Sequence, residues 1–286
     1  MRWGRRYLMC APEHYEVWYS INPWMDTTVV VDRDRALEQW DGLVATLEKA
    51  GATVDYLEPV AGLPDMVFTA NAGLVDGRTF IPARMRHPER RDEGAYAESW
   101  FRRRDFRIRE LGEDPEIVQE GSGDALPFAG SVVAGYRSRS SAQAAAALAR
   151  LVAAPVVPVE LLDPRYYHID LTFCPLDDRH ALVVPSAWNP SDAARVMALV
   201  PEPLVLEAHE AATFCANSVV VDRTVVMPAC PSRVGRQLEA WDFEVAVADV
   251  GEFIKAGGAV RCLTLALDVS LSVAAGAVVA EDLVGG

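Results

Sequence analysis

Residues 71–85 read NAGLVDGRTFIPARM, two short apolar runs joined by an Asp-Gly pair. An Asp-Gly pair between apolar runs is a strong signal for a β-hairpin. The pattern returns in DALPFAGSVVAGYRS (124–138), LTFCPLDDRHALVVPSAW (171–188) and NSVVVDRTVVMPACPS (217–232). A fifth, partial copy is split between AVRCLTLAL (259–267) and RYLMCAPEH (6–14). The sequence is therefore predicted to be built from one repeated unit.

Each hairpin is followed by a segment with helical periodicity and then by a short strand. The clearest helix is predicted at 32–51, where one face carries Leu37, Trp40, Leu43, Val44 and Leu47. The other helices are predicted at 94–106, 140–154, 191–200 and 232–241. The strands after the helices are predicted at 53–59, 107–112, 155–162, 203–208 and 243–249. The unit is thus hairpin, helix and strand, repeated every roughly fifty residues.

The split fifth copy predicts a ring in which the two ends of the sequence complete one unit. No linker, low-complexity tract or block of like charge divides the chain, so we expect one domain over residues 1–286. The predicted fold is α/β, a propeller of five pseudo-symmetric blades. The alternative is chance similarity between segments of a generic α/β protein.

Composition and charge exclude several classes of function. The chain has 286 residues, of which 41 are acidic and 27 basic, for a formal charge of −14. This balance argues against nucleic-acid binding and favours a small cationic ligand. No apolar run has the length of a signal peptide or a membrane span, so no membrane association is expected. The five cysteines form no Cys-x-x-Cys pair, which indicates free thiols in a reducing cytoplasm and no metal site.

Polar residues recur where each hairpin begins, and in a ring these equivalent positions converge on the axis. They are Asn71, Glu120, Asp124, His168, Asp170, Asn217 and Cys262. Buried polar groups need partners, so each residue is expected to contact another or a ligand. The segment His168-Ile169-Asp170 is predicted to be an extended strand, which would direct both polar side chains to one face.

These residue types indicate nucleophilic catalysis. Cys262 is the candidate nucleophile, His168 the candidate acid and base, and Glu120 or Asp170 the candidate orienting carboxylate. A free thiol has a pKa of about 8.5, so it needs a nearby positive charge, which the substrate itself can supply. The alternative for Cys262 is a buried packing cysteine. That interpretation is the one we give to the other four cysteines, Cys10, Cys174, Cys215 and Cys230.

Five segments resemble the guanidine-modifying enzymes of the pentein superfamily. They are LMCAPEHYEVWYSINPWM (8–25), PDMVFTANAG (64–73), EGSGD (120–124), HIDLTF (168–173) and GGAVRCLTLAL (257–267). The superfamily includes arginine deiminases, dimethylarginine dimethylaminohydrolases, amidinotransferases and arginine dihydrolases. The resemblance covers nearly the whole chain. It implies the five-bladed αβ propeller, a small guanidino substrate and neither a cofactor nor a metal, and it leaves homo-oligomerisation open.

The resemblance also implies a mechanism. Cys262 attacks the guanidino carbon, His168 protonates the leaving nitrogen, and water activated by His168 hydrolyses a thiouronium intermediate. Glu120 and Asp170 are expected to bind the planar N–H edges of the guanidinium, with Asn71 completing the pocket. The expected reaction is hydrolysis of arginine or an N-methylated arginine.

Further residues are expected to hold the rest of the substrate. By resemblance, Arg90 and Arg139 bind the α-carboxylate; the alternative is that both are solvated surface arginines. Asn22 is expected to close over the substrate, and is equally well explained as a turn residue before Pro23. Asp65 and Phe68 are additional candidate contacts.

Asn71 stands where deiminases and dimethylargininases usually carry Asp. An amide donates as well as accepts, so it can also bind a neutral ureido product and present it again. This resembles the arginine dihydrolases, which form ornithine, carbon dioxide and two ammonias. Dimethylargininase activity, which forms citrulline and an amine, remains an alternative. Two further alternatives are an amidinotransferase, which passes the amidino group to an amine, and a non-catalytic pentein binding module.

Overall fold

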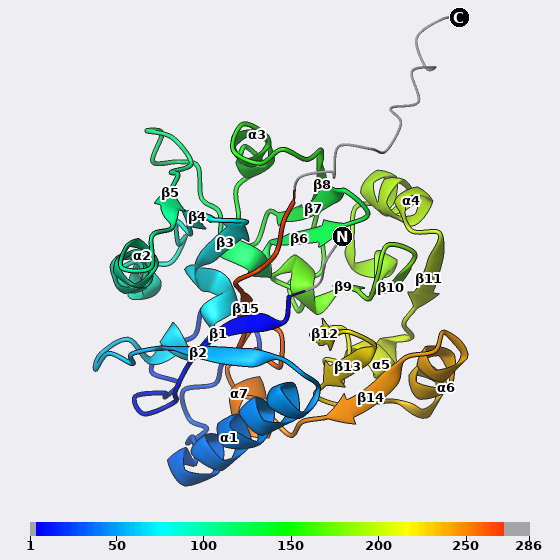
Figure 1. The fold of residues 1–286 in the computed structure, drawn as a ribbon, viewed down its shortest axis with the longest axis horizontal. Helices are drawn as coiled ribbons and strands as arrows, with labels where there is room; N and C mark the ends of the chain where they lie inside the picture. The colour runs from blue at the N-terminus through cyan, green and yellow to red at the C-terminus, as the bar shows by residue number, and fades with distance from the viewer. Residues whose placement is uncertain (1–3, 272–286) are drawn as a thin grey trace, which may run out of the picture.

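Figure 1 shows five small sheets arranged around a central axis, with the longer helices on the outside. The structure is a computed structural model and describes residues 4–271. In each three-stranded sheet the middle strand pairs antiparallel with one neighbour and parallel with the other. The predicted repeat of hairpin, helix and strand is confirmed, and so is the five-bladed αβ propeller.

The first sheet joins the two ends of the described chain. Its strands are β15 (Leu265–Ala266), β1 (Arg6–Cys10) and β2 (Thr53–Leu57), and α1 (Arg33–Lys49) connects β1 to β2. Tyr7 pairs antiparallel with Ala266, whereas Arg6 to Cys10 run parallel to Thr53 to Leu57. The split fifth unit of the sequence is therefore a real blade.

The other four blades repeat this order. The second has β3 (Gly73–Asp76), β4 (Thr79–Pro82), α2 (Glu93–Arg102) and β5 (Arg107–Ile108). The third has β6 (Ala125–Phe128), β7 (Ser131–Tyr136), α3 (Ala144–Ala149) and β8 (Val156–Glu160). The fourth has β9 (Phe173–Pro175), β10 (His180–Val183), α4 (Pro190–Leu199) and β11 (Glu202–Val205). The fifth has β12 (Val219–Val221), β13 (Thr224–Met227), α6 (Ser232–Ala240) and β14 (Glu244–Val247).

Short helical segments lie between the blades and, for η3 and η6, between the hairpin and the helix of one blade. Two are α-helices, α5 (Ala208–Ala211) and α7 (Gly251–Ile254). The 3₁₀ helices are η1 (Pro64–Val67), η2 (Thr69–Ala72), η3 (Pro88–Arg90), η4 (Gly121–Gly123), η5 (Ile169–Leu171) and η6 (Pro185–Ala187). No helix within residues 4–271 is long and apolar enough to cross a membrane.

Three helices differ from the prediction. On α1 the buried face includes Trp40, Leu43 and Leu47, but Leu37 is 44% exposed because it lies at the margin of the apolar stripe. Helix α2 ends at Arg102, four residues earlier than predicted. Helix α3 begins at Ala144, four residues later than predicted. Ser140 is not part of the helix because its hydroxyl donates to the Asp124 carboxylate (2.6 Å).

The buried cysteines pack in the core. Cys10 is fully buried, whereas Cys230 is only half-buried. Because removing a buried sulfur leaves a small cavity, we expect Cys10→Ala to cost about 1–2 kcal/mol of unfolding free energy with kcat unchanged. Cys230→Ala is the matched control and should cost less. Thermal melts and kcat measurements on both variants check this, and a loss of kcat in folded Cys10→Ala would contradict it.

Candidate active site

The polar residues at the axis lie on short turns that precede the hairpins. Asn71 lies on η2 and Asp170 on η5, and Glu120 comes directly before η4. His168 is extended (φ −123°, ψ 155°), but Thr172 N then donates to Ile169 O (2.9 Å). The predicted strand at 168–170 is therefore wrong from Ile169 onward, because the backbone forms a 3₁₀ turn there. The turn sends His168 and Asp170 to different partners.

Cys262 lies in a turn after α7, and its side chain is 3% exposed. The sulfur lies 3.3 Å from Asp170 Oδ2 and 3.2 Å from Asn217 Nδ2. Burial, followed by the negative charge of Asp170, raises the pKa of the Cys262 thiol well above its ordinary value. The thiol is therefore protonated here and donates its hydrogen to Asp170.

His168 and Glu120 form a buried pair. His168 Nε2 lies 2.8 Å from Glu120 Oε2, and Arg139 Nη1 donates to the same oxygen (2.9 Å). Glu120 Oε1 accepts from the backbone N–H of Arg86 (3.0 Å). Burial alone would raise the pKa of Glu120, but Arg139 and His168 outweigh it and hold that pKa well below its usual range. Glu120 is thus an ionised carboxylate with both oxygens in use.

This pairing bears on the two roles considered for Glu120. A carboxylate that already binds His168 and Arg139 has little capacity left to bind a substrate guanidinium. The geometry therefore favours Glu120 as the residue that orients His168, and it disfavours Glu120 as a guanidinium clamp. With Nε2 held by Glu120, His168 Nδ1 is the ring nitrogen available for proton transfer.

Glycines allow the turns to approach one another closely. A Cβ on Gly123 would lie 2.4 Å from Asn71 Nδ2 and 3.3 Å from His168 Nδ1. A Cβ on Gly258 would lie 2.4 Å from the Phe68 ring and 3.2 Å from Cys262 Cβ. Asn71 and His168 thus lie on either side of Gly123, and Phe68 and Cys262 on either side of Gly258. A side chain on either glycine would clash with these neighbours.

Arg90 is buried in an ion-pair network, not on the surface. Its Nε and Nη2 donate to both carboxylate oxygens of Glu93 (2.9 Å each), and Nη1 donates to Asn71 Oδ1 (3.0 Å). Nη2 also donates to Asp65 O (3.2 Å). Asn71 Nδ2 in turn donates to Glu120 O (3.0 Å). The N–H groups of Arg90 are therefore occupied by Glu93, Asp65 O and Asn71, which disfavours the expected contact with an α-carboxylate.

Arg139 and Asn22 hold the loop before α1 over the site. Arg139 Nη2 donates to Ile21 O (3.0 Å), and its guanidinium lies 4.7 Å from the Tyr167 ring centre. Asn22 Oδ1 accepts from Trp24 N (2.9 Å), the turn contact expected before a proline, and Nδ2 donates to Ala256 O (3.0 Å). Arg139 is 2% exposed, so the surface interpretation is wrong for it as well.

Two buried carboxylate oxygens, Asp65 Oδ1 and Asp170 Oδ1, have no hydrogen-bond partner within residues 4–271. Both side chains are almost completely buried. Burial is the main cause that raises the pKa of each carboxyl, that of Asp170 to about 6. Buried polar atoms are rarely left without partners. The buried hydroxyl of Tyr19 is also without a hydrogen bond of good geometry, and it lowers the pKa of Asp65. A planar cation with several N–H groups would supply further donors to both carboxylate oxygens.

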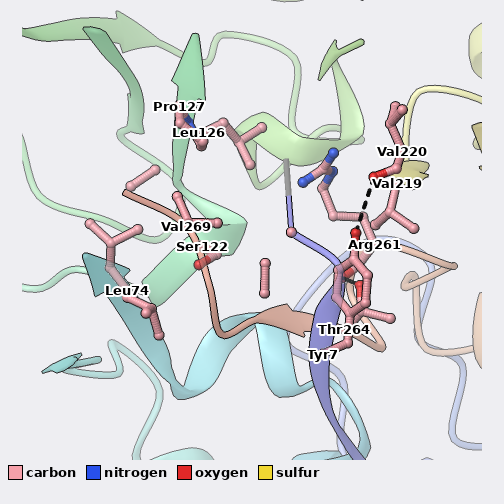
Figure 2. Close-up of a pocket in the computed structure, with 14 residues that line it drawn as sticks. Tyr7, Leu74, Ser122, Leu126, Pro127, Val219, Val220, Arg261, Thr264 and Val269 are labelled. Atoms are coloured by element: carbon pink, nitrogen blue, oxygen red, sulfur yellow. Dashed lines mark hydrogen bonds between the residues drawn. The ribbon is translucent and has the colours of Figure 1, made fainter. Parts of the chain in front are cut away.

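The candidate residues are separate from a cavity on the axis. Figure 2 shows that cavity, lined by residues that include Tyr7, Leu126, Val219 and Arg261. Its volume is about 40 Å³, well below the roughly 300–1,000 Å³ of small-molecule sites. None of the candidate catalytic residues lines it. Within the described residues, no group of three His, Cys, Asp or Glu side chains is placed to hold a metal ion.

Two residues were not given a role from the sequence. Glu93 follows Arg90 by three residues, a spacing that also occurs in solvent-exposed ion pairs, so the sequence does not single it out. Asn217 occupies one of the repeated axial positions, yet its contact with Cys262 depends on residues that lie 45 positions apart. Only the closed ring brings them together.

The chain is similar to known enzymes over most of its length. The family described as "N,N dimethylarginine dimethylhydrolase, eukaryotic" matches residues 21–269. The N(G),N(G)-dimethylarginine dimethylaminohydrolase of Mycobacterium tuberculosis is 39% identical over 91% of this chain and 85% of its own length. The bifunctional arginine dihydrolase/ornithine cyclodeaminase AgrE of Nostoc sp. is 40% identical over 91% of this chain, but over only 37% of its own length.

Solved structures agree with these relatives. The substrate-bound N-terminal domain of ArgZ, an arginine dihydrolase from cyanobacteria, superimposes with a TM-score of 0.89 at 36% identity, covering 93% of this chain and 99% of that chain. An Asn-to-Ser variant of the same domain, covalently bound to a reaction intermediate, gives the same TM-score. A dimethylarginine dimethylaminohydrolase adduct at 20% identity and TM-score 0.74 shares the pentein fold.

Proposed function

This chain belongs to the N,N-dimethylarginine dimethylhydrolase family, and we propose that it hydrolyses the guanidino group of arginine or an N-methylated arginine. The observation that carries this proposal is the Cys262 thiol held against Asp170 (3.3 Å), in a site with two unpaired carboxylate oxygens. The His168–Glu120 pair belongs to the same set of axial turns. The whole chain serves as one catalytic domain of the pentein fold.

The guanidinium binds between buried carboxylates. Asp65 Oδ1 and Asp170 Oδ1 are carboxylate oxygens without a hydrogen-bond partner in the described part of the chain, and they accept N–H groups from the planar cation. Asn71 is fixed by Glu120 O and by Arg90, which also contacts Asp65. In a site from which water is excluded, these charge-assisted hydrogen bonds are stronger than in solution. Asp65 thus takes the clamping role that the sequence suggested for Glu120.

The bound cation activates the nucleophile. Its positive charge offsets the burial and the Asp170 charge that hold the thiol of Cys262 protonated, so the proton passes to His168. The thiolate then bonds to the guanidino carbon, and the C–N bond breaks as His168 returns the proton to the leaving nitrogen. Water, deprotonated by His168, adds to the resulting thiouronium carbon, and the C–S bond breaks to release the ureido product and the thiolate.

The substrate reaches this site only when the covering loop moves. Cys262, His168 and Asp170 are each 3% exposed or less. The loop is attached through Ile21 O to Arg139 and through Trp24 Nε1 to Arg165 O (2.8 Å). These few hydrogen bonds can open without disrupting a blade, and their closure excludes water from the reaction.

A second round of the same chemistry converts citrulline to ornithine. Arginine plus two waters gives ornithine, carbon dioxide and two ammonias. Asn71 supports this outcome because an amide can hold a neutral ureido group by donating or accepting hydrogen bonds. A carboxylate at this position would prefer the cation. We therefore propose arginine dihydrolase activity before dimethylargininase activity.

Product analysis separates these activities. The protein is incubated with L-arginine, with dimethylarginine, and with L-arginine plus glycine, and the products are identified by mass spectrometry. Ornithine from arginine supports the dihydrolase, and citrulline plus dimethylamine from dimethylarginine supports the dimethylargininase. An amidino group transferred to glycine identifies an amidinotransferase, and no reaction in any incubation overturns the proposal.

The affinity for arginine is expected to fall below pH 6. The carboxylate form of Asp170 binds the cation, and its pKa is raised to about 6 by burial, so acid protonates it. Burial also raises the pKa of Asp65, so its protonation in acid lowers the affinity further. One required ionisation lowers affinity about tenfold per pH unit below the pKa. Calorimetric titration of the Cys262→Ser variant with L-arginine from pH 8 to 5 measures this, and equal affinity at pH 7 and 5 would contradict it.

The cellular compartment follows from the thiol. The five cysteines are all free in the structure. A nucleophilic cysteine must stay reduced to react, which favours a reducing compartment such as the cytoplasm.

A further inference from the structure

Asn217 lies at the axis immediately before β12 and is fully buried. Its Oδ1 accepts from the backbone N–H groups of Ala259 (3.2 Å) and Cys262 (3.1 Å). A backbone N–H can only donate, so these contacts determine which end of the amide is oxygen. Nδ2 therefore points to the Cys262 sulfur (3.2 Å) and to Asp170 O (3.3 Å). All four hydrogen-bonding positions of the side chain are used.

We propose that Asn217 is a catalytic residue whose amide N–H stabilises the thiolate of Cys262 in both steps of the reaction. This inference rests on the proposed function, because it requires Cys262 to be the nucleophile. The sulfur has an acceptor, Asp170 Oδ2, and a donor, Asn217 Nδ2. When the proton leaves, the contact with Asp170 becomes repulsive and the contact with Asn217 becomes a charge-assisted hydrogen bond. The same N–H stabilises sulfur as the leaving group of the thiouronium.

The surroundings of the sulfur make this donor important. Asp170 contacts it from the segment before β9, the Tyr167 hydroxyl in the same segment donates to Gly257 O (2.8 Å), and Arg261 precedes it in sequence. Burial raises the pKa of Tyr167 well above its ordinary value, so this hydroxyl stays neutral. Burial and Asp170 raise the pKa of the Cys262 thiol, whereas the Ala259 N–H and Asn217 lower it. Removing the Asn217 donor should therefore raise the thiol pKa further.

Asn217→Asp removes the donor and keeps the shape of the side chain, and the negative charge that it adds raises the thiol pKa in the same direction. One carboxylate oxygen still accepts from Ala259 N and Cys262 N, so the turn stays anchored. The other oxygen replaces the N–H that faces the sulfur. We expect the pH midpoint of Cys262 alkylation by iodoacetamide, followed by peptide mass spectrometry, to rise by about one pH unit or more. With arginine as substrate, kcat should fall about a hundredfold while KM changes much less.

Alkylation needs no substrate, so it tests Asn217 even if the proposed reaction is wrong. Ser218→Ala is the matched control: the residue is equally buried, its hydroxyl donates to Cys215 O (2.8 Å), and it should leave the midpoint unchanged. If Asn217→Asp does not fold, the side-chain amide signals of the wild type are followed by ¹⁵N NMR. The Asn217 signal should shift as Cys262 titrates. An unchanged alkylation midpoint in folded Asn217→Asp, or no shift of that signal, overturns the inference.

Discussion

Replacing Cys262 with alanine should lower kcat for arginine by at least about ten-thousandfold, since removal of a catalytic nucleophile typically has an effect of this size. The reason is specific to the site. The sulfur is positioned by Asp170 and Asn217, and no other described cysteine is placed against the axial carboxylates. Without the sulfur, water would have to attack the delocalised guanidinium directly. The measurement is steady-state kcat with L-arginine at saturation.

The controls for Cys262→Ala are its folded state and its affinity for L-arginine. Melting temperature and circular dichroism should remain close to wild type, because the removed atom touches polar partners that water can replace. L-arginine should still bind, since Asp65 and Asp170 are retained. A folded Cys262→Ala protein with kcat within tenfold of wild type would show that the thiol is not the nucleophile.

Replacing Asn71 with aspartate should change the product from ornithine to citrulline, with the ratio of the two shifting on the order of a hundredfold. One oxygen of the new carboxylate keeps the Arg90 contact. The other oxygen replaces Nδ2 and would face Glu120 O without a hydrogen, so we expect it to turn toward the guanidinium. This favours the cation over neutral citrulline, which then leaves after the first round.

The readout is the citrulline-to-ornithine ratio over time, together with the rate at which each variant consumes added citrulline. Asn71→Ser is a useful comparison, because it removes the amide without adding charge. If wild-type protein releases only citrulline from arginine, or if Asn71→Asp still forms ornithine at the wild-type ratio, Asn71 does not control the second round. The cysteine mechanism would survive that outcome.

The fold could be predicted in detail because its signals are local. Asp-Gly and Asp-Arg pairs between apolar runs mark the hairpins at β3–β4 and β12–β13. The repeat then gives the order of elements in every blade, and the split copy gives the β1–β15 pairing that closes the ring. The local sequence pattern did not predict the backbone where an element contributes side chains to the site. The backbone forms a 3₁₀ turn from Ile169 to Leu171, and α3 is shortened at Ser140.

The site was harder to predict because its charged side chains come from different blades and pair with one another. The sequence places Glu120 and His168 near the axis, and the resemblance adds Arg139 as a substrate contact, but the sequence cannot say which pairs form. Glu120 lies 48 positions before His168 and binds it directly, so the buried carboxylate oxygens left without a hydrogen bond in residues 4–271 are Asp65 Oδ1 and Asp170 Oδ1 instead. Likewise, Arg90 fixes Asn71 through a contact that spans two turns of one blade. Residue types predict nucleophilic catalysis and the resemblance implies a guanidino substrate, whereas the assignment of roles depends on the three-dimensional network.

The most direct test of the cysteine mechanism is to stop wild-type protein with acid during turnover of L-arginine and to map its peptides by mass spectrometry. We expect a fraction of the peptide containing Cys262 to be heavier by the mass of arginine less one ammonia. That fraction should disappear once the arginine is exhausted, and it should be absent from Cys262→Ala. Turnover without any adduct at quench times shorter than one catalytic cycle, or with the adduct on a different residue, would contradict the account.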